Sequence, residues 1–350
     1  MKNANRSLKW LACGLCLTTV LYNCKTKETA SIPPVTYTFP GLDGVKMPDL
    51  KQTAPAAVSV TAATFTPSPM AAAVGSALDN IAATGKVPDA VQQAGTDLSK
   101  AVSDDKAASL SAGFNADVVR TMSTTGKVPA SMQADVAAIA ANPSVSGYMP
   151  TYTLPMVNGK PVGGRVGAHS PGLVKPLNAV TDASTDACKK AANDAYTTLV
   201  AGLDQTRQAQ TNTVNATYSA AEAAALADVA GCQTNVTAKY TPLIAGATAN
   251  LNATLAKLDA ARSVLGERLY NLLTVMAYVA YSQTITAFST LQTAENQVCT
   301  TVKDAKVAAA KVARDADLNT ITTNYNTTLA TATAARDKAV ANCHNQGNGG

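Results

Sequence analysis

The chain has 350 residues, with 28 lysines and arginines against 23 aspartates and glutamates, which gives a net charge of +5. A nucleic-acid surface needs clustered basic residues in larger excess, so this balance excludes nucleic acid as a partner. Although 47% of the residues are hydrophobic, 68 residues are alanines, which bury little surface and favour helix. The composition therefore predicts helices without a large aromatic-rich core.

The N-terminus has the pattern of a secretory signal peptide. Lys2, Arg6 and Lys9 precede an apolar stretch from Trp10 to Tyr22, which corresponds to the charged and hydrophobic regions of such a signal. The apolar stretch is too short to span a bilayer permanently. We therefore expect residues 1–23 to be a signal peptide that is removed from the mature protein.

The apolar stretch ends at Leu21-Tyr22-Asn23-Cys24, which resembles the lipobox of bacterial lipoproteins. The resemblance implies cleavage before Cys24 and acylation of its sulfur and its new amino group. Asn23 departs from the pattern, which usually has Ala, Gly or Ser at this position. The acyl chains would anchor the mature protein to a membrane, and the absence of an acidic residue beside Lys25 favours the outer membrane. A secreted protein without lipid and an uncleaved anchor are the alternatives.

The prolines divide the chain near Leu177. Fifteen of the sixteen prolines precede this residue, and Pro242 follows it, so the two halves differ in backbone constraints. Residues 24–69 are rich in Pro, Thr and Ser without sustained periodicity, which predicts a tether.

Residues 70–142 have the pattern of a small helical module. One pentapeptide occurs twice, at Thr84–Pro88 and at Thr125–Pro129. Its glycine is expected to end one helix and its proline to begin the next. Neither copy has the earlier glycine or the following Ser or Thr of a phosphate-binding loop.

Residues 143–176 form a Gly/Pro-rich connector, either a small hairpin or an extended segment. Arg165 and His169 lie in this connector, and His344 lies near the C-terminus. Because no arrangement of a catalytic or metal-binding site surrounds them, we expect no enzyme activity, no metal and no cofactor.

Residues 177–345 predict long helices, followed by a flexible tail at 346–350. The cysteines in this part form two pairs with the same internal spacing of 44 residues: Cys188 with Cys232, and Cys299 with Cys343. That spacing equals four eleven-residue units, which return to one helix face. The intervening eleven-residue steps are mostly apolar: Leu199, Gln210 and Ala221 in the first unit, and Ala310, Ile321 and Ala332 in the second.

Between these two units lies a heptad seam of apolar residues. It continues from Leu251 to Val279 across Gly266, which favours one uninterrupted helix there.

The helix lengths favour a three-helix bundle with helices at 188–232, 243–288 and 299–343. In that topology Cys188 would pair with Cys299, and Cys232 with Cys343.

Two other pairings stay open. An antiparallel two-helix rod turning at Gly266 would join Cys188 to Cys343 and Cys232 to Cys299. Alternatively, each 44-residue unit would close into its own hairpin.

The expected function is that of a non-catalytic bacterial cell-envelope lipoprotein. It would act as a structural spacer or as a module that binds an unknown envelope partner, with the membrane contacted through the lipid. The alternative is a membrane-active protein that resembles the helical pore-forming toxins, with Leu265–Phe288 as the segment released into a bilayer.

Overall fold

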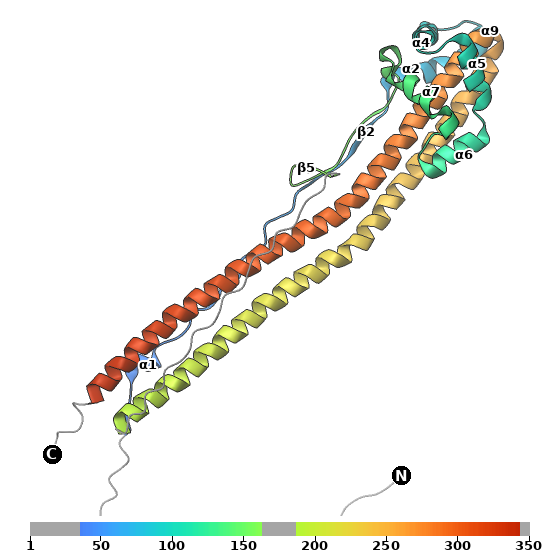
Figure 1. Ribbon diagram of the computed structural model, residues 1–350. Helices are drawn as coiled ribbons and strands as arrows, with labels where there is room; N and C mark the ends of the chain where they lie inside the picture. Colours follow the sequence, from blue (N-terminus) through green and yellow to red (C-terminus); the bar gives the residue numbers. More distant parts are fainter. Residues whose placement is uncertain (1–35, 163–186, 344–350) are drawn as a thin grey trace, which may run out of the picture.

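Two long helices that meet at Gly266, together labelled α9 (Ala187–Asn342), dominate the fold. The computed structural model describes residues 36–162 and 187–343. Gly266 interrupts α9 with φ 69° and ψ 159°, a backbone region open essentially only to glycine. The chain reverses there into two antiparallel arms, the ascending arm (187–265) and the descending arm (267–342) (Figure 1). At 1.5 Å per residue each arm is about 115 Å long, and the predicted all-α rod is confirmed.

The predicted three-helix bundle is wrong, and the two-helix alternative is correct. Helix α9 continues through Pro242 and through residues 289–298, where the bundle required connections. Pro242 is exposed, so water can bind the carbonyl that loses its backbone donor. The heptad pattern continues in the sequence across Gly266, but its two halves lie on different arms. Leu258 before the turn and Leu272 after it are both fully buried near the tip.

A head of short helices surrounds the turn of the rod, which we call the tip (Figure 1). These helices are α2 (Pro69–Leu78), α3 (Ile81–Thr84), α4 (Asp89–Ser99), α5 (Asp104–Gly113), α6 (Ala116–Thr125), α7 (Ala130–Ala141) and α8 (Pro143–Ser146). Polar side chains cap several of them. Ser68, for example, accepts a hydrogen bond from the backbone N–H of Ala71 at 3.0 Å, and Asn115 accepts one from Val118 at 3.0 Å.

The repeated pentapeptide has the predicted structure in both copies. Gly85 ends α3 with φ 66°, and Gly126 ends α6 with φ 70°, the left-handed conformation that favours glycine. Pro88 and Pro129 then stand at the N-caps of α4 and α7. The helix-loop-helix interpretation of residues 70–142 is therefore correct.

The main hydrophobic core lies between the head and the tip. Phe114 of the head stacks on Tyr278 of the descending arm, with ring centroids 4.2 Å apart and planes 5° from parallel. Ile81 and Leu98 of the head are also fully buried in this core. The most apolar part of α9 thus serves as half of a core, which explains why its composition differs from that of the rest of the rod.

Residues 40–66 do not form the predicted tether. They begin with α1 (Pro40–Asp43) and run along the rod toward the head (Figure 1), and we call them the ribbon. Leu42 and Met47 are only 3% and 7% exposed, and burial of such side chains against the rod stabilises this path.

Short strands connect the ribbon to the segment that follows the head. They are β1 (Val60–Thr61), β2 (Thr64–Thr66), β3 (Thr151–Thr153), β4 (Met156–Val157) and β5 (Lys160–Pro161). All pairs are antiparallel, in the orders β1-β4-β5 and β2-β3. Asn158 and Gly159 both have positive φ values, 49° and 73°, as a tight hairpin turn requires. The hairpin alternative is thus correct for residues 156–161.

Candidate functional site

Two disulfides join the arms of the rod. Cys188 pairs with Cys343 at the base of the rod, with 5.7 Å between the Cα atoms, and Cys232 pairs with Cys299 between base and tip, with 5.8 Å. The preferred pairing of Cys188 with Cys299 and of Cys232 with Cys343 is wrong. Because the arms are antiparallel, each cysteine faces the one equally distant from Gly266.

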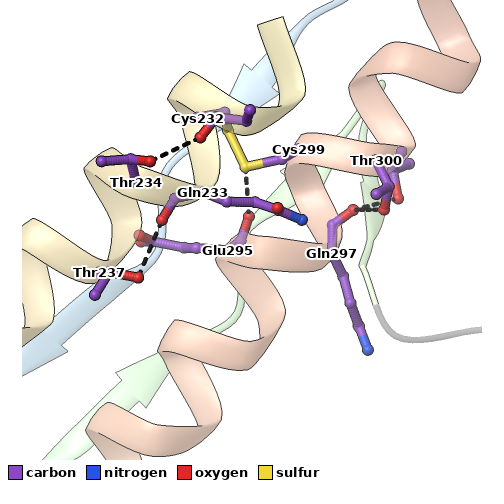
Figure 2. Close-up of a disulfide and its surroundings, with 10 residues drawn as sticks. Cys232, Gln233, Thr234, Thr237, Glu295, Gln297, Cys299 and Thr300 are labelled. Atoms are coloured by element: carbon purple, nitrogen blue, oxygen red, sulfur yellow. Dashed lines mark hydrogen bonds between the residues drawn. A yellow bond between two sulfur atoms is a disulfide. The ribbon is translucent and has the colours of Figure 1, made fainter. Parts of the chain in front are cut away.

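The cysteine positions themselves contained the signal for this pairing. The two disulfides span 155 and 67 residues, and both spans have their midpoint next to Gly266. Figure 2 shows Cys232 of the ascending arm joined to Cys299 of the descending arm. The hydroxyls of Thr237 and Thr300 near this disulfide donate to carbonyl groups of their own helices, at 3.1 and 2.9 Å.

An eleven-residue period organises the contact between the arms. On the descending arm, Ala310, Ile321 and Ala332 are all buried as predicted. On the ascending arm, the buried row is displaced by four residues from the predicted one. It consists of Ala192, Leu203, Val214, Ala225 and Val236. Because this period nearly matches that of a straight helix, the arms stay in contact over a long distance with little supercoiling.

A ladder of arginine and tyrosine side chains accompanies this core. The guanidinium carbons lie 4.5 to 4.9 Å from the ring centroids on the opposite arm. The pairs are Arg336 on Tyr196, Arg207 on Tyr325 and Arg314 on Tyr218. Each such contact contributes about 0.5–1 kcal/mol. The ladder gives Arg207 a partner on the opposite arm.

Near the base of the rod, the ribbon packs as a third segment against the two arms. Met47 packs in a cluster with Leu203 and Ile321, one from each arm. The buried carboxylate of Asp317 accepts hydrogen bonds from the backbone N–H and from the hydroxyl of Thr53, at 3.0 and 2.6 Å. Since this cluster contains residues of both arms, the ribbon adds a further connection between them.

The head contains a buried carboxylate with several donors. Asp97 accepts hydrogen bonds from Gln93 at 3.0 Å, from Lys100 at 2.9 Å and from the Tyr148 hydroxyl at 3.2 Å. The bonds from Gln93 and Lys100 are the main reasons why the pKa of Asp97 is lowered. Burial, followed by the Asp97 carboxylate, raises the pKa of Tyr148 to about 12. These donors stabilise the charge of Asp97, and its hydrogen bond with Tyr148 links α4 to the turn after α8.

Several predicted residues lie outside the part of the chain that the structure describes. They are the signal peptide, Cys24, Arg165, His169, His344 and the C-terminal tail. Within residues 36–162 and 187–343, no group of three or more His, Cys, Asp and Glu side chains is arranged to hold a metal ion. In the same residues, no helix is both long and apolar enough to cross a membrane.

Comparisons with protein-family models, with curated proteins and with solved structures found no match to this chain.

Proposed function

We propose that the protein is a non-catalytic cell-envelope lipoprotein whose rod holds the helical head away from the membrane. The observation that carries this proposal is the separation of the two ends of the molecule. Helix α1 packs beside the last turns of the descending arm, near Ala335, while the head surrounds the tip (Figure 1). An anchor at Cys24 would enter the molecule at the base and leave the head about 115 Å away.

The construction of the rod supports a spacing role. An isolated pair of long helices bends easily, and here two disulfides, the arginine–tyrosine ladder and the ribbon all connect the arms. These connections lie between the base and the head, where they keep the rod extended and straight. The head is then available to bind an envelope partner.

Cryo-electron tomography of the lipidated protein in liposomes tests this proposal. We expect head density about 115 Å above the bilayer. A Cys24→Ser variant is the control, and it should leave the liposomes bare and move into the soluble fraction. Heads that lie on the bilayer would contradict the spacing role, and membrane retention of the variant would contradict the lipid anchor.

A second candidate function is membrane activity of the helical toxin type. The observation that favours it is that the apolar segment Leu265–Phe288 is covered by a separate module, the head. Release of this segment would require the head to leave a core that includes Phe114 and Tyr278. Dye-loaded liposomes distinguish the two functions, because a spacer leaves the dye inside and a pore-forming protein releases it.

A further inference from the structure

A cleft of about 460 Å³ lies between the head and the rod, just below the tip. Helix α2 forms one wall, and the arms form the others through residues 242–258 and 273–288. At 1.5 Å per residue the cleft extends about 24 Å along the rod. Its volume lies within the range of binding sites for small molecules.

Small side chains leave this space open. The lining includes alanines and glycines on all three walls: Ala71, Gly75, Gly246, Ala247, Ala277 and Ala280. A Cβ atom added at Gly75 or at Gly246 would meet no other atom within 4 Å. Gly246 and Asn250 are exposed, so the cleft opens to the surface along the ascending arm. A largely apolar cleft of this size, open to solvent on one side, is typical of a ligand site.

The lining is apolar and contains no charged side chain among the described residues. Phe65 and Phe288 close the end toward the base, with ring centroids 4.6 Å apart. Leucines, including Leu258 and Leu273, close the end toward the tip. Asn250 and Thr254 are polar lining residues, and neither can neutralise an ionic group on a ligand.

The cation beside the cleft already has a partner. Lys257 donates to the Gly75 carbonyl at 3.3 Å, and its ammonium group pairs with Asp79 at 2.7 Å. A ligand carboxylate would have to compete with Asp79 for this charge. The site therefore favours an uncharged polar group over an anionic one.

We infer that this cleft binds a single aliphatic chain with an uncharged head group, such as the acyl chain of a monoacylglycerol. The elongated shape fits an extended chain better than a compact ring system. The apolar walls provide the binding energy. The side-chain amide of Asn250 suits a hydroxylated head group, and so does the hydroxyl oxygen of Thr254, which can accept while it donates to the Asn250 carbonyl at 2.9 Å. This site is independent of the spacing function.

Binding of N-phenyl-1-naphthylamine, an uncharged probe that fluoresces in apolar surroundings, tests the inference. Wild-type protein should give a saturable rise in fluorescence, and monoolein should displace the probe at about tenfold lower concentration than oleate. No saturable rise, or displacement by oleate as effective as by monoolein, would overturn the inferred specificity.

Variants locate the binding in the cleft. Gly75→Leu fills the space from α2, and Gly246→Leu fills it from the ascending arm. The matched control is Ala73→Leu, on an exposed position of α2 outside the lining. With far-UV circular dichroism unchanged, each filling variant should bind the probe at least about tenfold more weakly than the control. Wild-type affinity in either folded filling variant would refute the site.

Discussion

Replacement of Gly266 by alanine tests the reversal of the chain on which the whole rod depends. At φ 69° and ψ 159°, a residue with a side chain is strained by about 1–3 kcal/mol. A Cβ atom there would meet nothing within 4 Å, so the cost comes from the backbone alone. Alanine also lowers the conformational entropy of the unfolded chain, which stabilises the folded protein by about 0.4–1 kcal/mol and offsets part of this strain. We therefore expect Gly266→Ala to lower the free energy of unfolding by up to about 2.5 kcal/mol.

Gly202→Ala is the matched control. Gly202 is helical and exposed on the ascending arm, and a Cβ atom there also meets nothing within 4 Å. The same chemical change should stabilise the protein by up to about 1 kcal/mol, because alanine is the better helix former. Urea denaturation followed by far-UV circular dichroism measures both variants. If Gly266→Ala stabilised the protein as Gly202→Ala does, residue 266 would be helical and the reversal would be refuted.

Other predictions concern the head, the ribbon and the disulfides. Folding raises the pKa of Tyr148 from 10 to about 12, so its stabilising contribution is complete below pH 10 and is lost as the pH rises to 12. The stability difference between wild type and Tyr148→Phe, about 1–2 kcal/mol at neutral pH from the hydrogen bond to Asp97, should therefore shrink across that range, and a constant difference would show that folding does not raise this pKa. Asp317→Ala removes the acceptor of the Thr53 backbone N–H and hydroxyl and should accelerate amide hydrogen exchange in residues 45–58, whereas unchanged exchange would mean that the ribbon does not depend on this carboxylate. Reduction of both disulfides should lower the thermal midpoint, because loops of 155 and 67 residues contribute on the order of 4–5 kcal/mol each in the chain-entropy model; an unaltered midpoint would argue against the cross-links.

Local signals predicted much of this fold. The pentapeptide loops were predictable because glycine favours the end of a helix, and the proline that follows Gly85 or Gly126 favours the start of the next one. The eleven-residue period was predictable because it repeats over many turns of helix. Both features depend on residues close together in the chain.

The turn at Gly266 was predicted only as an alternative, because glycine within a helix costs only about 1 kcal/mol and is often tolerated there. The apolar pattern on both sides also continued without a break. That pattern reflects the head, whose core covers both arms at the tip. The position of Gly266 midway between the cysteines was the signal that distinguished a turn from a tolerated glycine.

The ribbon was mistaken for a tether because its composition is typical of one. Its apolar side chains, such as Leu42 and Met47, are too isolated to form a pattern along the chain. Met47 becomes part of a hydrophobic core only where Leu203 and Ile321 of the two arms meet it, and that contact is a tertiary feature. For the same reason the cleft between α2 and the rod left no recognisable trace in the sequence.

The antiparallel rod is the central claim, and mapping of disulfide-linked peptides from non-reduced protein by mass spectrometry tests it most directly. The structure predicts peptides that join Cys188 to Cys343 and Cys232 to Cys299. Peptides that join Cys188 to Cys299 and Cys232 to Cys343 would instead require parallel arms, and they would contradict the reversal at Gly266.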